Sequence, residues 1–101
     1  MVENFRIEYL PIAQEDLNDI IDYIQKDNPD AAKSFADRLD KAVSNLARFP
    51  KSGHVPNDER LQNLGYRMLV IDKYLVFYFI KENLVEIRRI IHGSRRYSFL
   101  L

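Results

Sequence analysis

The chain has 101 residues, no cysteine and a formal net charge of zero at pH 7. This length predicts one domain, residues 1–101, with a modest core. The lack of cysteine excludes disulfides and thiolate chemistry, and overall neutrality argues against a general nucleic-acid coat protein. No stretch has the length of a membrane span, and the N-terminus lacks a signal-peptide pattern. We therefore expect a cytoplasmic protein that does not contact a membrane.

The charge is divided unevenly between the two parts of the chain. Residues 1–59 contain 7 Lys/Arg and 12 Asp/Glu, a net charge of −5, and residues 60–101 contain 8 Lys/Arg and 3 Asp/Glu, a net charge of +5. From Arg88 onward there are four arginines and no acid. This pattern points to an anionic or acidic partner. The alternative is that helices simply carry more solvated acids than strands do.

The first predicted element is a strand over residues 5–10. Phe5, Ile7 and Tyr9 alternate along it and would share one face. Pro11 then stops the strand, and its fixed φ angle suits the first turn of a helix.

Two amphipathic helices are predicted next. The first covers residues 12–27, where apolar residues recur at helical spacing. Asn28 precedes a proline and so leaves the helical region, which separates this helix from a second one ending near Arg48. So short a link predicts an antiparallel helical hairpin. The acids of the first helix are interpreted as a solvated face rather than a catalytic pair: Glu15, Asp16, Asp19 and Asp22.

A long loop is predicted after the second helix. Phe49-Pro50 ends that helix, and residues 51–65 contain two glycines and Pro56. Leu61 and Leu64 are expected to anchor the end of this loop to the core.

Three short strands are predicted in the last third of the chain. Asp72-Lys73 is expected to form a two-residue turn and residues 81–83 a slightly longer one. The predicted order is therefore βααβββ, an α+β fold with a helical hairpin packed on a mostly antiparallel four-stranded sheet. The expected strands cover about residues 66–71, 74–80 and 84–91.

The sequence offers little for metal, cofactor or serine chemistry. His54 and His92 have no helix-spaced partner, so no metal site and no cofactor are predicted. The three glycines are too far apart for a phosphate-binding loop. Ser94 lies close to His92, but no G-x-S-x-G elbow surrounds it.

The remaining candidates are basic or aromatic and lie toward the C-terminus. The arginine fork suits phosphate or carboxylate, and histidine and tyrosine exchange protons or stack on a base. Such a group can cleave RNA without a metal: a base activates the ribose 2′-OH, arginine holds the phosphate, and an acid protonates the leaving oxygen. The catalytic candidates are Arg67, His92, Arg95 and Tyr97, and the target-binding candidates are Arg89, His92, Arg95, Arg96 and Tyr97.

A structural interpretation of the same residues stays open. Arg89 alternates with apolar residues of the last strand, so its stem would pack along their face. His92 would merely end that strand, and Arg95 and Arg96 would pair with the acidic first helix. The apolar residues expected to share a face with Arg89 are Val85, Ile87 and Ile91.

An ordered set of short motifs runs over almost the whole chain. In the last third, Tyr66-Arg67 is followed by YLVFYFI at residues 74–80 and VEIRRIIHGSRRY at residues 85–97. Together with the front half, this set resembles the RelE/ParE superfamily of toxins from bacterial type II toxin–antitoxin systems. The front-half positions are Leu10-Pro11, Asp16-Leu17, Ile21, Tyr23-Ile24, Pro29, Ala31-Ala32, Phe35, Leu39, Leu46-Ala47, Pro50 and Gly53.

The resemblance implies a βααβββ toxin that is neutralised in a hetero-oligomer by a cognate antitoxin from the same operon. RelE-like members are metal-independent endonucleases that cut mRNA on the ribosome. ParE-like members poison DNA gyrase and cut no substrate themselves. A third alternative is a degenerate toxin that only binds its antitoxin as a co-repressor. The chain is an enzyme only under the RelE-like alternative.

The residues favour the ParE-like alternative. The basic set of the RelE-like members would begin at Arg67 and end with Arg95 and Tyr97, but Leu69 stands two residues after Arg67. The third-strand position of that set is also apolar or aromatic, at Tyr74 or Leu75. The ParE-like H-G-x-R element is intact at residues 92–95, although Arg96 stands where that subgroup often has an acid. A catalytic set of His92 with Arg67 and Tyr97 remains an alternative.

Overall fold

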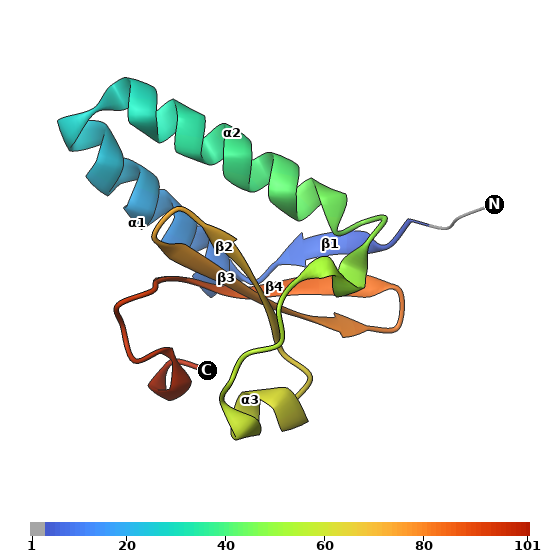
Figure 1. Ribbon diagram of the computed structural model, residues 1–101. Helices are drawn as coiled ribbons and strands as arrows, with labels where there is room; N and C mark the ends of the chain where they lie inside the picture. Colours follow the sequence, from blue (N-terminus) through green and yellow to red (C-terminus); the bar gives the residue numbers. More distant parts are fainter. Residues whose placement is uncertain (1–3) are drawn as a thin grey trace.

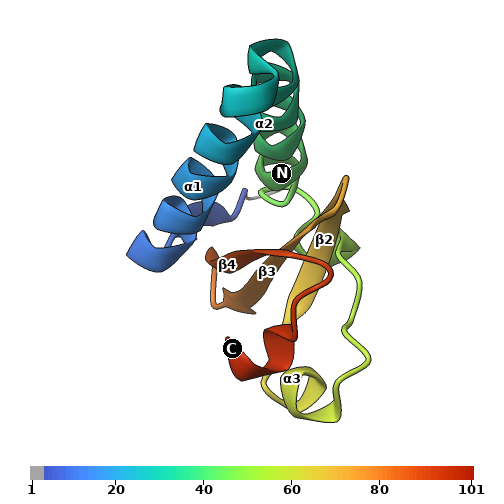
Figure 2. The ribbon, with the colours of Figure 1, turned by 90° about the vertical axis from the view of Figure 1, so that its left-hand side faces the viewer.

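The structure, a computed structural model, describes residues 4–101. A four-stranded sheet carries two long helices on one face, and the C-terminal segment and a short helix lie on the other (Figures 1 and 2). No helix in this part of the chain is both long enough and apolar enough to cross a membrane. The elements are β1 (Arg6–Tyr9), α1 (Pro11–Asp27), α2 (Pro29–Asn45), the 3₁₀ turn η1 (Pro50–Ser52), α3 (Glu59–Asn63), β2 (Arg67–Ile71), β3 (Tyr74–Lys81), β4 (Leu84–His92) and the 3₁₀ turn η2 (Tyr97–Phe99).

The sheet has the strand order β1-β4-β3-β2. The β2–β3 and β3–β4 pairs are antiparallel, as expected for strands joined by tight turns. The two helices carry the chain from β1 across to the far side of the sheet, so β1 pairs in parallel with β4. The predicted α+β fold, a helical hairpin on a mostly antiparallel sheet, is confirmed.

The two helices of the hairpin begin where the sequence predicts, at Pro11 and at Pro29. Pro11 occupies the first turn of α1. Asn28 has an extended backbone, which ends α1, and its Oδ1 accepts a hydrogen bond from the Ala31 amide at 3.1 Å, which caps α2. The second helix ends at Asn45 rather than near Arg48, because residues 46–48 form a turn.

Each face of the sheet has its own apolar cluster. We call the face under α1 and α2 the inner face and the opposite one the outer face. The inner cluster is the larger and packs helix residues such as Phe35 and Leu39 against Val76, Tyr78 and Ile87. The outer cluster is built from Leu61, Tyr66, Phe77 and Ile91, with Met68, Leu75, Phe79, Tyr97, Leu100 and Leu101 packed around it.

The prediction of an unstructured loop over residues 51–65 is wrong in part. The segment contains α3, whose Asp58 caps the helix by accepting from the Leu61 amide at 3.0 Å. His54 also pairs with Met68 on the edge of β2. Leu61 is buried as expected, but Leu64 is 55% exposed and anchors nothing. Burial of Leu61 under the sheet explains why so short a helix persists.

A β-bulge in β4 overturns the expected alternation of Arg89 with the apolar residues before it. Tyr78 of β3 pairs with Ile87, but the next residue, Phe77, pairs with Arg89, so Arg88 is an extra residue. Val85 and Ile87 therefore face inward, whereas Arg88 and Arg89 both face outward. The turn after β3 is also shorter than predicted, with only residues 82–83 between the strands.

Candidate functional site

The end of β4 and the turn that follows it form the most cationic exposed segment of the described chain. We call residues 92–96 the basic turn. The Gly93 amide donates to the Lys73 carbonyl at 2.8 Å, and the Arg95 amide donates to the His92 carbonyl at 3.0 Å. The first bond ties the basic turn to the β2–β3 turn at residues 72–73. A Cβ at Gly93 would lie 3.3 Å from that carbonyl, so glycine permits this close approach.

Ser94 fixes how His92 presents its imidazole. The Ser94 amide lies 3.1 Å from His92 Nδ1, and the Ser94 hydroxyl lies 2.7 Å from the same atom. A backbone amide only donates, so Nδ1 accepts and the proton of the neutral ring sits on Nε2. The His92 ring also contacts the Tyr74 ring edge-on, with centroids 5.3 Å apart. His92 is thus held on the inner face as a hydrogen-bond donor.

Arg95 and Arg96 are exposed, and neither guanidinium has an ion pair or hydrogen bond within residues 4–101. Tyr97 turns away from them. Its ring packs on Phe77 of the outer cluster, with centroids 4.9 Å apart. The structural interpretation in which Arg95 and Arg96 pair with the first helix is therefore wrong.

The arginine that pairs with α1 is Arg89, and its partner is Asp16. Asp16 accepts from Nε and Nη2 of Arg89 at 2.7 and 3.1 Å, and both side chains are only 16% exposed. Asp16 also accepts from the Ile90 amide at 3.0 Å. This amide lies beyond Ile87, the last β4 residue paired with β1, so the carboxylate replaces the missing strand. The interpretation of Asp16 as part of a solvated face is wrong, while Glu15, Asp19 and Asp22 are exposed as expected.

Arg88 is also occupied within the fold. Its guanidinium lies 4.8 Å from the centroid of the Phe79 ring and 6.0 Å from that of Tyr66, and it donates to Glu86 at 2.6 Å. Bonding to the Asp16 carboxylate raises the pKa of Arg89. Burial would lower the pKa of Arg88, but the bond to Glu86 and the interactions with Tyr66 together raise it. Both arginines therefore stay charged and serve as links between elements.

Arg67 opens β2, as predicted, but binds a loop. Its Nη1 donates to the carbonyls of Lys51 and Gly53, each at 3.1 Å. The buried Tyr78 holds the same loop, because its hydroxyl donates to the Pro50 carbonyl at 2.8 Å and accepts from the Gly53 amide at 2.9 Å. Arg67 of β2 and Tyr78 of β3 thus both hold residues 50–53 against the sheet.

The structure does not bring the four catalytic candidates together. His92 aligns with Tyr74 and Ile71 across the sheet, and Arg67 lies four residues before Ile71, roughly 13 Å along the strand. Tyr97 lies on the outer face, whereas His92 lies on the inner face. Only His92 and Arg95 share one segment.

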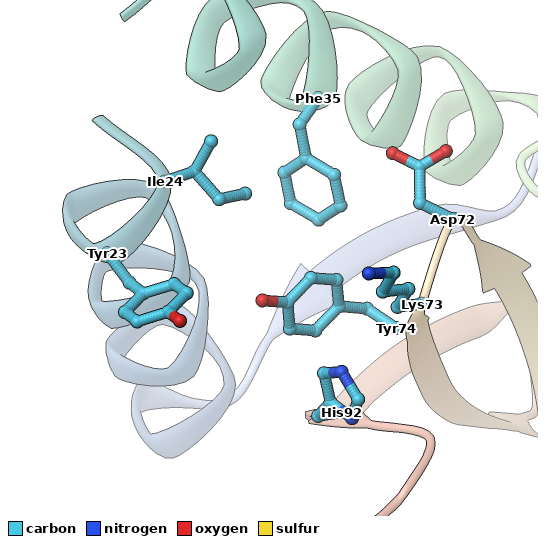
Figure 3. A pocket seen from close by; sticks show the side chains of 7 residues that line it. All are labelled: Tyr23, Ile24, Phe35, Asp72, Lys73, Tyr74 and His92. Atoms are coloured by element: carbon cyan, nitrogen blue, oxygen red, sulfur yellow. The ribbon is translucent and has the colours of Figure 1, made fainter. Parts of the chain in front are cut away.

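The sequence reasoning missed a hollow beside the basic turn. It has a volume of about 630 Å³ and lies between the helical hairpin, the β2–β3 turn and the end of β4 (Figure 3). Of its side chains only His92 is a site candidate from the sequence, because the lining residues come from four separate segments. Its lining residues are Tyr23, Ile24, Phe35, Asp72, Lys73, Tyr74 and His92. Within residues 4–101, no three His, Cys, Asp or Glu side chains gather as they would around a metal ion.

Comparison with known proteins identifies the family. Residues 7–97 match the family described as the ParE toxin of the type II toxin–antitoxin system parDE. The chain is 37% identical over 84 residues to the Caulobacter vibrioides toxin RelE2, covering 82% of this chain and 89% of that protein. It is 32% identical over 96 residues to the Sinorhizobium fredii protein Y4kP, covering 95% and 96% of the two chains.

Two solved structures share the fold. A chain of the chromosomal ParDE system from P. aeruginosa superposes with a TM-score of 0.73 at 18% identity, covering 89% of this chain and 97% of that one. A chain of the Mycobacterium tuberculosis RelBE2 toxin–antitoxin complex gives a TM-score of 0.60 at 22% identity, covering 88% and 98%. The chain therefore belongs to the ParE toxin family, within the RelE/ParE superfamily, and is the toxin of a type II toxin–antitoxin system.

Proposed function

We propose that this toxin arrests growth by poisoning DNA gyrase through a protein contact made by the basic turn. The contact would use the guanidinium groups of Arg95 and Arg96, with His92 at the start of the basic turn. Tyr97 follows the turn in the chain, and its ring anchors the turn on Phe77. Arg89 supports the turn from within, since Asp16 occupies its guanidinium. Exposed arginines with no partner in residues 4–101 are free to bind carboxylate or phosphate groups of a target.

The observation that carries this proposal is the dispersion of the catalytic candidates. RNA cleavage needs a base, an acid and an anion holder within hydrogen-bond reach of one phosphodiester. Here Arg67 binds a loop and lies about 13 Å along β2 from Ile71, the β2 residue aligned with His92. Tyr97 lies on the opposite face of the sheet from His92. A contact poison has no such requirement, because it needs only an exposed complementary surface.

Ribosome-dependent mRNA cleavage is the second candidate function. One observation favours it: the Ser94 amide and hydroxyl both contact Nδ1 of His92, which leaves Nε2 as the ring nitrogen available to an RNA substrate beside the hollow. The name of the relative RelE2 points the same way. Under this alternative water would take the proton of the ribose 2′-OH, His92 in its protonated form would give a proton to the leaving oxygen, and Arg95 would hold the phosphate.

Purified components separate these functions. A gyrase poison should trap cleaved DNA with purified gyrase and no ribosome, and the Arg95→Ala/Arg96→Ala variant should lose that effect. The control Arg6→Ala/Arg48→Ala removes the same charge from exposed sites elsewhere. Cleavage of mRNA only in the presence of ribosomes would overturn the proposal. A protein that does neither and arrests no growth would be the degenerate co-repressor.

His92→Gln sharpens the distinction between the two functions. Glutamine keeps a polar side chain of similar reach, so gyrase poisoning should fall by less than about tenfold. A ribonuclease that uses His92 for proton transfer should lose roughly 10²–10⁴-fold in rate. A folded His92→Gln protein that has lost ribosome-dependent cleavage would establish the second function.

We further propose that a cognate antitoxin segment covers apolar surface of the hairpin and sheet and adds a strand to an edge. Within the described residues, β1 and β2 are the two edge strands of the sheet. The free edge of β1 has no neighbouring strand, and the free edge of β2 pairs only at Met68, with His54. Co-expression with the operon neighbour should raise Tm and give a co-eluting complex. Equal stability alone and no co-elution would contradict this.

A further inference from the structure

The hollow joins aromatic rings from four elements around one space. Tyr23 of α1 and Tyr74 of β3 point toward one another across it, with Phe35 of α2 on one side and His92 on the other (Figure 3). The Phe35 and Tyr74 rings meet edge-on at 5.3 Å. Tyr23 is 73% exposed, so its ring contributes little to the core. The wall of the hollow therefore includes the largely exposed ring of Tyr23 and the half-buried rings of Tyr74 and His92, whereas Phe35 belongs to the core.

The charge at the rim of the hollow is positive. Asp72 lines it, but Arg38 of α2 binds both oxygens of that carboxylate and lowers its pKa, so it stays ionised and paired. Lys73 makes no ion pair within residues 4–101 and sits beside the basic turn through the Gly93–Lys73 hydrogen bond. On the α1 side, Lys26 and Asp27 lie next to the hollow with opposite charges that offset one another. An anionic group is therefore favoured near Lys73.

Hydrogen-bonding groups also face this space. The imidazole of His92 lines it with its proton fixed on Nε2 by the two contacts from Ser94. The phenols of Tyr23 and Tyr74 both donate and accept. Burial raises the pKa of Tyr74, with a smaller contribution from Tyr23, which agrees with two phenols that approach one another. These polar groups disfavour an aliphatic side chain as the occupant, because it would leave them unpaired.

We propose that the hollow binds a planar heteroaromatic ring bearing a phosphate, as in a nucleoside monophosphate or a terminal nucleotide of a single strand. The ring would lie against the tyrosines, since bases of any sequence stack on aromatic side chains. The phosphate would lie near Lys73, and His92 would donate to the ring edge or the sugar. The volume of about 630 Å³ falls within the range of small-ligand sites. This site does not depend on gyrase, because a protein-contact poison requires no nucleotide.

The test is binding of defined probes to the full chain, measured by calorimetry and by NMR of the histidine and tyrosine rings. UMP and AMP should bind and shift the His92 resonances. Uridine and inorganic phosphate should each bind at least fivefold more weakly, because each lacks half of the recognised chemistry. A pentauridylate that binds much more tightly than UMP assigns the site to a strand, and equal affinity assigns it to a free nucleotide.

Matched variants locate the site. Tyr23→Ala should weaken UMP binding at least fivefold, the low end of what one base–aromatic stack contributes. Lys73→Gln should weaken UMP binding but leave uridine binding unchanged. The controls are Phe99→Ala, which removes a ring 80% exposed on the other side of the sheet, and Lys51→Gln. Both Tyr23 and Lys73 are exposed, so their variants should keep the wild-type Tm.

Three results would overturn the proposal. One is no binding of any nucleotide at millimolar concentration. Another is equal binding of UMP and inorganic phosphate, which would mean that Lys73 binds the phosphate and that the hollow does not bind the base. The third is equal weakening of UMP binding by the control variants. Gyrase trapping in the Tyr23→Ala variant tests the proposed function separately, because that function predicts no change there.

Discussion

Two pairs of arginines at the C-terminal end of the chain behave in opposite ways. Arg88 and Arg89, at the bulge in β4, are held by Glu86 and two rings and by Asp16, respectively. Arg95 and Arg96, one turn later, are exposed and bind nothing within residues 4–101. The difference teaches that charge alone does not identify a binding surface. Arg88 and Arg89 stabilise the fold, and the fold holds Arg95 and Arg96 in place for a target.

The largest expected effect is that of Asp16→Ala on stability. The change leaves the Arg89 guanidinium and the Ile90 amide without their acceptor in a site that is only 16% exposed. We expect a loss of about 3 kcal/mol, the lower end for breaking one side of a buried pair. This corresponds to a fall in Tm of roughly 12 °C or more. Thermal unfolding measures it.

Asp19→Ala is the control for that prediction, since Asp19 lies on the exposed side of the same helix. It should change the free energy of unfolding by less than about 0.5 kcal/mol. Equal losses of stability in the two variants would mean that the Asp16–Arg89 ion pair contributes no more to the fold than an exposed acid of the same helix.

Tyr78→Phe should have the next largest effect. Its hydroxyl is buried and bonds both the Pro50 carbonyl and the Gly53 amide. Leaving these two groups unpaired should cost about 2 kcal/mol in denaturant unfolding. Tyr97→Phe is the matched control, because the Tyr97 hydroxyl has no hydrogen bond among the described residues. A Tyr78→Phe protein as stable as Tyr97→Phe would show that the loop at residues 50–53 does not need this clamp.

The smallest expected effect is that of Asp72→Asn, and it depends on pH. The Arg38 hydrogen bonds hold the pKa of Asp72 below its ordinary value of 3.8. A lowered pKa in the folded state means that the carboxylate adds stability above about pH 4 and loses it as pH falls through the folded pKa. Because the pair is exposed, the Tm difference between wild type and variant should be small at pH 6 and should shrink as the pH falls below about 4. A difference that stays constant with pH would contradict this origin.

The sequence was sufficient to predict the elements that local chemistry controls. Pro11, Asn28 and Pro29 set the starts of both long helices and the end of the first, and the apolar, β-rich runs from Tyr74 onward indicate the long hairpin. The helix α3 was missed, although Asp58 three residues before Leu61 is a readable cap signal. The prolines and glycines on both sides of residues 58–63 favoured a loop and outweighed this cap signal.

The bulge and its ion pair were beyond such reasoning, because pairing between strands decides them. The run from Ile87 to Ile91 breaks the alternation with two arginines followed by two isoleucines, which in retrospect is the trace of an extra residue. Which acid would reach Arg89 depends on α1 folding back over the end of β1. The hollow was also unpredictable, since its rings come together only when the hairpin and the two turns meet.

The contrast between the two arginine pairs is tested most directly by measuring growth arrest and Tm together for Arg95→Ala/Arg96→Ala. We predict that this variant keeps the wild-type Tm within about 2 °C, since exposed substitutions change stability little, and no longer arrests growth. Arg6→Ala/Arg48→Ala should keep both properties. Full growth arrest by the Arg95→Ala/Arg96→Ala protein, or a fall in its Tm as large as that of Asp16→Ala, would contradict the assignment of the basic turn to the target contact.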